Sequence, residues 1–211
     1  DRMNTNIFTD KFSEPLSGKT AVKVNIHAGD GNLTIDPLTS GEAVLASGAL
    51  QYTEKQGPPT RILDANHDQA SLTLKGSRAG QPWFHFPWSA CNGATEWQIH
   101  LNPSVSSDIT AHSDGGNVKL NLSGMKVTRV SADTGRGNME VVLPDNADNL
   151  SVTAETGAGG SKHSLKFKDG PGGASYFPHL VQYLGRETHL LQRARSEILD
   201  QDGRFFNEAL E

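Results

Sequence analysis

The chain has 211 residues, of which 35% are apolar and 22 are glycine, and this turn-rich, thin-cored composition favours one all-β domain over a compact α/β enzyme. The formal net charge of −5, with scattered Lys and Arg, argues against nucleic acid, which requires a clustered basic face. The single cysteine, Cys91, excludes an internal disulfide and any zinc site with two or more cysteine ligands.

Four segments of the chain match one another: VNIHAGDGNLTID (24–36), ITAHSDGGNVKLN (109–121), VSADTGRGNMEVV (130–142) and VTAETGAGGSKHS (152–164). Their paired turn positions are Gly31-Asn32, Gly116-Asn117, Gly137-Asn138 and Gly159-Gly160. The last three pairs recur after 21 and 22 residues, which predicts a β-solenoid of strand, glycine turn and strand. Glycine fits such turns because it adopts φ > 0 without strain, and stacked asparagines can hydrogen-bond along the stack.

Other strands are predicted between the first and second repeats, at residues 42–47, 49–53, 60–63, 70–75 and 96–102, with turns at 57–59 and 66–68. We expect them to form broader and less regular coils. From Ser175 onward, leucines recur at helical spacing, which predicts an amphipathic helix entered after Pro178. The expected organisation is therefore a β-solenoid domain over residues 1–174 and a helical C-terminal tail or cap over residues 175–211.

An ordered series of motifs runs through the repeats: an early GDGNLTID, then W-x-I-x-L-N-P, D-I, LNLSGMKV and VVLP. This series resembles the toastrack-type putative adhesin domains, including the extracytoplasmic part of LiaF-like cell-wall-stress response proteins, over about residues 20 to 170. The resemblance implies a right-handed parallel β-helix-like stack outside the membrane, of a binding or signalling class, with no catalytic residues to carry over. In that family further β coils usually follow, whereas this chain is predicted to turn helical after Gly173.

The Gly135-x-Gly137 set resembles the start of a dinucleotide-binding loop, but its context excludes that interpretation. Such a loop must open a helix whose N-terminus meets the pyrophosphate, whereas here the strand-like MEVVLP follows. The glycines are therefore interpreted as a turn, and no cofactor is predicted.

One column of polar residues lies four positions before the second glycine of each repeat and contains His27, His112, Asp133 and Glu155. If the coils stack in register, His112, Asp133 and Glu155 lie one above another at about 4.8 Å and form a mixed N/O set that could hold a divalent metal. The alternative is a solvated polar ladder, which strand alternation favours because these positions face outward.

The segment PWFHFPW (82–88) concentrates four aromatic residues: Trp83, Phe84, Phe86 and Trp88. An exposed aromatic shelf of this kind would suit sugar rings or a protein partner. The alternative is that the segment covers one end or one face of the stack.

The function expected from these features is that of a non-enzymatic cell-envelope binding or regulatory module, with an envelope protein or polysaccharide as partner. One alternative is a β-helix carbohydrate-active enzyme. The only nearby candidates for its catalytic residues are Asp114, Asp133, Glu140, Glu155 and Arg136. Another is a structural element that assembles with copies of itself through its end strands. No run of about 18 apolar residues occurs, and the chain starts at Asp1, so the precursor sequence decides whether a membrane anchor or signal segment precedes it.

Overall fold

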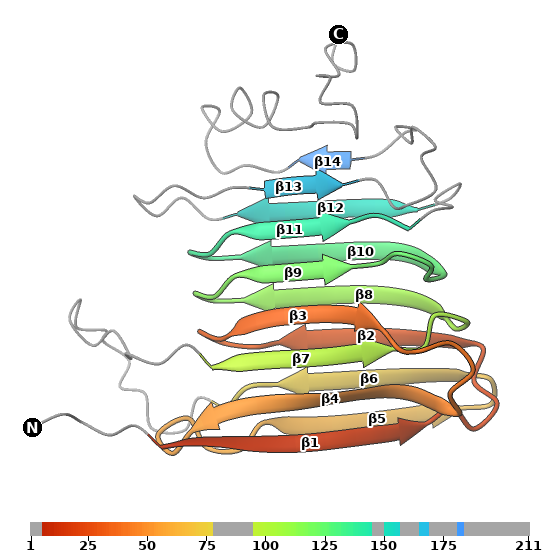
Figure 1. The fold of residues 1–211 in the computed structure, drawn as a ribbon, viewed down its shortest axis with the longest axis horizontal. Coiled ribbons are helices and arrows are strands. Elements are labelled where there is room, and N and C mark those ends of the chain that lie inside the picture. The colour runs from red at the N-terminus through yellow and green to blue at the C-terminus, as the bar shows by residue number, and fades with distance from the viewer. Residues whose placement is uncertain (1–5, 78–94, 145–149, 157–164, 169–180, 184–211) are drawn as a thin grey trace, which may run out of the picture.

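The computed structural model describes residues 6–77, 95–144, 150–156, 165–168 and 181–183, and the regular elements in these ranges are all β-strands. The strands form two stacked seven-stranded sheets, sheet A with the order β1-β4-β7-β3-β9-β11-β13 and sheet B with the order β14-β12-β10-β8-β2-β6-β5 (Figure 1). Their bounds are β1 (Ile7–Pro15), β2 (Ala21–His27), β3 (Asn32–Pro37), β4 (Val44–Thr53), β5 (Thr60–Asn66), β6 (Gln69–Lys75), β7 (Glu96–Leu101), β8 (Ser106–Ser113), β9 (Val118–Asn121), β10 (Val127–Thr134), β11 (Met139–Val142), β12 (Ser151–Thr156), β13 (Leu165–Lys168) and β14 (Val181–Tyr183).

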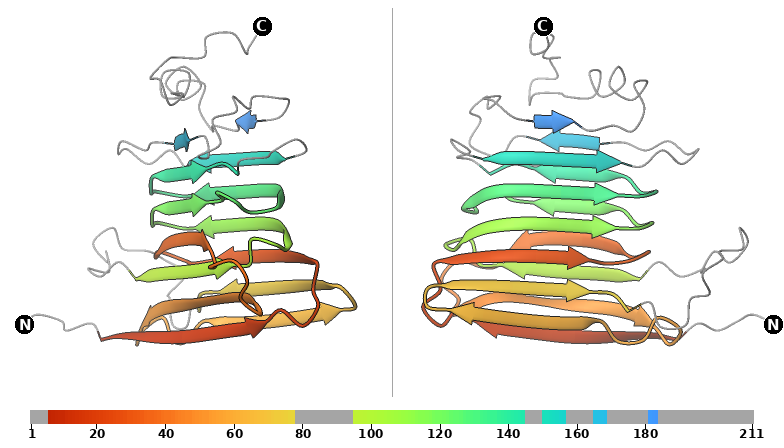
Figure 2. Two further views of the ribbon diagram at one scale, coloured as in Figure 1. Left: turned by 45° about the vertical axis from the view of Figure 1, so that its right-hand side comes forward. Right: turned by 180° about the vertical axis from the view of Figure 1, so that it is seen from behind.

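The upper part of the molecule is a stack of parallel coils, as Figure 2 shows from two sides. From β7 onward, successive strands alternate between the two sheets, so that β8–β9, β10–β11 and β12–β13 each form one coil. The first repeat joins the same stack, because β2 pairs with β8 and β3 pairs with β9, both in parallel. The first strands of the four repeats, β2, β8, β10 and β12, are therefore neighbours in sheet B, although a long stretch of chain separates the first repeat from the second.

The core lies between the two sheets and follows the period-2 alternation of the strands. In sheet B, Val24, Ile109 and Val130 occupy one register row and are fully buried, and Leu33 and Val118 are buried from the side of sheet A. Burying such a side chain stabilises the fold by roughly 1.5–3 kcal/mol. A single coil is too thin to bury its own apolar side chains. The coils above and below it cover them and so stabilise it.

The lower end of the stack is antiparallel, which differs from the irregular coils predicted there. Strand β4 pairs with β7 and β1, and β5 pairs with β6, in each case antiparallel. The turn between β5 and β6 was predicted and is confirmed, with His67 at φ 48°. So tight a connection can only return the chain antiparallel to itself, which explains why the parallel pattern of sheet B stops at β6. Strand β1 was not predicted from the sequence.

Sheet B receives its last strand from the region predicted as a helical tail. Val181–Tyr183 form β14, which runs parallel to β12, so the helix prediction is wrong at these three residues. A β-branched residue and a tyrosine in this tripeptide suit a strand at the open edge of β12. The rest of residues 175–211 lies outside the described ranges. Among the described residues, no helix is long and apolar enough to cross a membrane.

Candidate functional site at the corner of the stack

The repeated glycines form a tightly stacked corner, and their structural reason differs from the predicted one. A Cβ at Gly116 would lie 2.1 Å from the carbonyl oxygen of Gly31, and a Cβ at Gly137 would lie 1.9 Å from that of Gly116. The glycines with positive φ are others, among them Gly29 and Gly124. Close backbone approach, and not a left-handed conformation, therefore requires glycine at these corners.

The asparagines that follow the glycines form the predicted ladder, and its bonds run from backbone to side chain. The backbone N–H of Asn117 donates to Oδ1 of Asn32 over 2.9 Å, and the N–H of Asn138 donates to Oδ1 of Asn117 over 2.9 Å. Each asparagine thus satisfies a backbone donor of the next coil, which fixes the vertical register of the corner.

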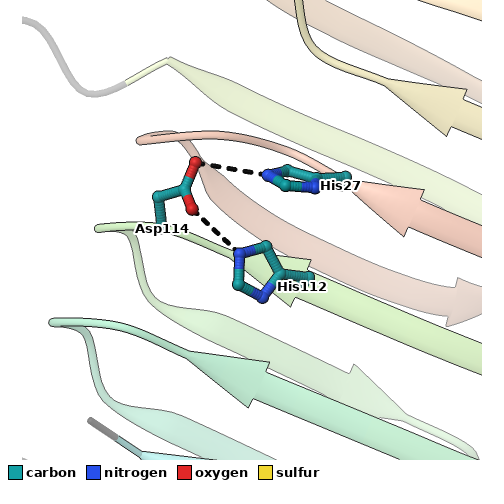
Figure 3. A group of neighbouring side chains, drawn as sticks. All are labelled: His27, His112 and Asp114. Carbon is teal, nitrogen blue, oxygen red and sulfur yellow. Dashed lines mark hydrogen bonds and ion pairs between the residues drawn. The ribbon is translucent and has the colours of Figure 1, made fainter. Parts of the chain in front are cut away.

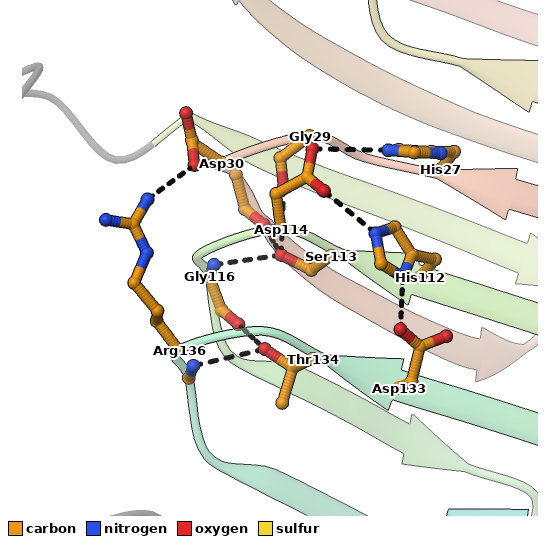
Figure 4. Close-up of polar contacts among 12 residues, drawn as sticks. His27, Gly29, Asp30, His112, Ser113, Asp114, Gly116, Asp133, Thr134 and Arg136 are labelled. Carbon is orange, nitrogen blue, oxygen red and sulfur yellow. Dashed lines mark hydrogen bonds and ion pairs between the residues drawn. The ribbon is translucent and has the colours of Figure 1, made fainter. Parts of the chain in front are cut away.

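Buried hydroxyl groups complete the corner (Figure 4). Ser113 Oγ donates to the carbonyl oxygen of Gly31 over 2.9 Å and accepts from the N–H of Gly116 over 2.8 Å. One coil further, Thr134 Oγ1 donates to the carbonyl of Gly116 over 2.8 Å and accepts from the N–H of Gly137 over 3.1 Å. The same hydroxyl bridge is thus repeated in successive coils, and the corner is a rigid platform for the side chains beside it.

The polar column predicted from the sequence lies beside this corner on the outer face of sheet B. His27 is opposite His112, His112 is opposite Asp133, and Asp133 is opposite Glu155 in the strand register. The stacking in register that the prediction required is therefore present.

Four residues here make direct side-chain contacts, and we call them the His–Asp cluster: His27, His112, Asp114 and Asp133. Nε2 of His27 lies 3.2 Å from Oδ2 of Asp114, and Nε2 of His112 lies 2.9 Å from Oδ1 of the same carboxylate (Figure 3). Nδ1 of His112 contacts Oδ2 of Asp133, and the two imidazole rings meet edge to face with centroids 4.3 Å apart. The His112 ring is thus held between two carboxylates.

The surroundings of His112 favour its charged form. Burial is the largest single influence and acts against the imidazolium, but the hydrogen bonds to Asp114 and Asp133 and their negative charges together outweigh it. The pKa of His112 is therefore raised above its ordinary value. His112 therefore holds its proton more strongly than a free histidine does.

From the sequence, Asp114 was predicted only as possible catalytic material and not as part of the polar column. Asp114 lies just beyond the end of β8, where period-2 alternation no longer applies. The turn directs its carboxylate toward His27 and His112, and the carboxylate contacts both rings. The residues whose ligand atoms all lie within 4.8 Å of one another are His27, His112 and Asp114. Glu155 belongs to the same row but is separated from His112 by Asp133. The signal that could have identified Asp114 is the H-x-D spacing directly before a glycine corner.

Several predicted site residues lie outside the described ranges. They are the aromatic residues Trp83, Phe84, Phe86 and Trp88 and the turn residues Gly159 and Gly160. The aromatic shelf therefore stays a prediction.

A two-sheet stack of parallel coils with repeated glycine corners, closed at one end by antiparallel strands, defines a toast-rack type of β domain. The chain belongs to the family described as the N-terminal domain of toast_rack, DUF2154, whose model matches residues 3–163. The resemblance drawn from the sequence motifs is thereby confirmed.

The fold is also found in a solved structure, that of a "putative cell adhesion protein" from Clostridium sporogenes. The two chains are 20% identical and superimpose with a TM-score of 0.65, over 78% of this chain and 73% of the other. At this identity the likeness shows a shared fold. A search of the curated proteins finds no match.

Proposed function

We propose that the domain is a non-enzymatic, adhesin-like binding module of the cell envelope, which holds an envelope polysaccharide on the outer face of sheet B. Membership of the toast_rack family and the shared fold with a protein described as a "putative cell adhesion protein" support this class. The observation that carries the proposal is a row of short polar side chains on that face.

This row, which we call the polar row, crosses five neighbouring parallel strands of sheet B in register, and it consists of Thr73, Asn25, Thr110, Ser131 and Thr153. All five side chains are half-buried, so their tips face outward from a rigid sheet. Successive members are about 4.8 Å apart, and each can both donate and accept a hydrogen bond. Sugar hydroxyls have the same two-way hydrogen-bonding capacity, so an extended glycan laid across the strands can pair with several members at once.

The middle of the row offers a direct test. We expect Thr110→Arg to weaken binding to purified, insoluble cell-wall polysaccharide by about tenfold or more, because a long side chain at the centre of the contact displaces the glycan. Thr34→Arg is the matched control, since Thr34 is a half-buried, outward-facing threonine on the central strand β3 of the opposite sheet. Co-sedimentation of the protein with the polysaccharide measures both variants. The proposal is wrong if wild-type protein does not sediment, or if the two variants lose binding equally.

A second function, pairing between copies of the chain, is favoured by the lower end of sheet B. Strand β5 is the edge strand there, and all seven of its residues are exposed, with Ile62 at 55%. An edge strand that carries an exposed apolar side chain can pair with a second copy unless a charge discourages it.

Replacing Ile62 by lysine tests that pairing. We expect wild-type protein to self-associate at high concentration in sedimentation velocity and Ile62→Lys to shift the distribution toward monomer, because an edge lysine resists strand addition. Gln98→Lys, at an exposed position on the interior strand β7 of sheet A, is expected to behave as wild type. A wild-type protein that stays monomeric at every concentration would contradict the assembly function.

A further inference from the structure

The His–Asp cluster contains possible metal ligands, which the polar row lacks. We propose that it is a binding site for one Zn²⁺, or a similar late first-row divalent ion, with Nε2 of His27, Nε2 of His112 and the carboxylate of Asp114 as ligands.

The distances between the ligand atoms fit such an ion. Zinc binds imidazole nitrogen and carboxylate oxygen at about 2.0–2.2 Å, which places tetrahedral ligand atoms about 3.3 Å from one another. Nε2 of His27 lies 3.2 Å from Oδ2 of Asp114, and Nε2 of His112 lies 2.9 Å from its Oδ1. One ligand atom from each of the three residues lies within 4.8 Å of the other two. Small side-chain movements would therefore suffice to admit the ion.

The contact between His112 and Asp133 gives the ring the orientation that metal-binding histidines adopt. A neutral His112 that donates its Nδ1–H to Asp133 presents a lone pair at Nε2, directly toward Oδ1 of Asp114. A metal ion held between this nitrogen and Asp114 would take the place of the proton that otherwise joins them over 2.9 Å. A carboxylate behind a ligating histidine is the usual second partner in zinc sites and increases the basicity of the ligand.

The donor set selects the class of ion. Two imidazole nitrogens with one carboxylate suit zinc, nickel or copper, whereas magnesium and calcium prefer sites made of oxygen. The side chains of His27, His112 and Asp114 are 34%, 29% and 31% exposed, so a fourth position faces solvent and can take water or an oxygen of a bound partner.

The surrounding charge also favours a divalent cation. Asp133 and Glu155 continue the row with two more carboxylates, while the lysine in the row, Lys75, lies opposite His27. The nearby guanidinium of Arg136 is bound to Asp30 over 3.1 Å. A doubly charged ion would offset more of this negative charge than the single proton of an imidazolium can.

The proposal is tested on the full chain after treatment with a chelator. Calorimetric titration with Zn²⁺ near neutral pH should saturate at one ion per chain, and the same titration with Mg²⁺ or Ca²⁺ should give no saturable binding. Zn²⁺ should also raise the Tm, because an ion that binds only the folded state stabilises it. Co²⁺ should give the visible absorption of a low-coordinate N/O site.

Single variants assign the ligands. His27→Ala and His112→Ala should each weaken Zn²⁺ binding by about 100-fold, and Asp133→Asn by about tenfold through its support of His112. The matched control is His100→Ala, which removes a half-buried histidine from the outer face of sheet A and should leave the affinity unchanged. Far-UV circular dichroism without metal shows whether each variant is folded, and the Co²⁺ spectrum of a folded ligand variant should be lost.

Two results would overturn the site. One is the absence of saturable Zn²⁺ binding to the wild-type chain. The other is wild-type affinity in folded His27→Ala and His112→Ala, together with loss of binding on Cys91→Ser, which would place the ion elsewhere. Thr110→Arg should leave Zn²⁺ binding intact, so the metal site and the glycan-binding proposal can fail independently.

Discussion

Replacing Gly137 by alanine is expected to lower the free energy of unfolding by about 3 kcal/mol or more. The new Cβ would lie 1.9 Å from the carbonyl oxygen and 2.4 Å from the carbonyl carbon of Gly116. Both atoms belong to backbone that the stack holds in place, since the same oxygen accepts the hydrogen bond of Thr134. The corner would have to open, and the bond from the N–H of Asn138 to the side chain of Asn117 would be lost with it. Urea unfolding followed by circular dichroism measures the effect.

Gly124→Ala is the matched control for this substitution. Gly124 has φ +67°, and no atom lies within 4 Å of the place that the methyl group of an alanine would take. Alanine there meets only left-handed backbone strain of about 1–2 kcal/mol. Equal losses in the two variants would show that backbone conformation, and not stacking distance, explains the glycine at the corner.

The parallel part of the fold could be predicted because its repeats express one local pattern several times. Apolar alternation before and after Gly116-Asn117 recurs around Gly137-Asn138, and each copy supports the interpretation of the other. The reason for the glycine could not be predicted in the same way. The short distance between a glycine and the carbonyl oxygen of the neighbouring coil depends on how closely two coils stack. The sequence of one repeat does not contain that distance.

The candidate site was only partly predictable for a related reason. His27, His112 and Asp133 fall in one register row, and a row follows directly from the repeat alignment. Asp114 enters the cluster from a turn, where the direction of a side chain depends on the backbone path and not on alternation. Sequence therefore indicated the ladder and not the carboxylate that joins its two histidines.

The antiparallel end escaped prediction because β4 and β5 have no repeat to compare with. The antiparallel end meets the parallel stack at the segment WQIHLNP (97–103), which is one of the motifs on which the family resemblance was based. Ile99 and Leu101 of β7 are fully buried, and Trp97 Nε1 donates to the carbonyl oxygen of Gln51 on β4 over 2.9 Å. The motif therefore joins the parallel stack to its antiparallel end.

Asn102, at the end of this motif, should be one of the most sensitive polar residues of the domain. Its Nδ2 donates to the carbonyl oxygens of Val44 over 2.7 Å and of Glu42 over 3.2 Å, and its Oδ1 accepts from the N–H of Ser104 over 2.9 Å. Since Asn102 is only 5% exposed, Asn102→Ala would leave these backbone groups without their partner. We expect a loss of about 3 kcal/mol in the free energy of unfolding, measured by urea titration.

Asn121→Ala is the matched control, because Asn121 ends β9 and, like Asn102, accepts a hydrogen bond from the backbone N–H two residues further on. Its Oδ1 accepts from the N–H of Ser123 over 3.3 Å and from the Oγ of Ser123 over 2.7 Å, which are contacts within its own turn, so we expect a loss of about 1 kcal/mol.

Asn102→Asp keeps the acceptor for Ser104 but directs a carboxylate at two carbonyl oxygens, so it should destabilise at least as much as alanine. Hydrogen exchange should then show early loss of protection in β4 while β10 stays protected. If Asn102→Asp retains wild-type stability, Asn102 does not hold β4 against the stack, and the hydrogen bonds of β4 to β7 and β1 suffice.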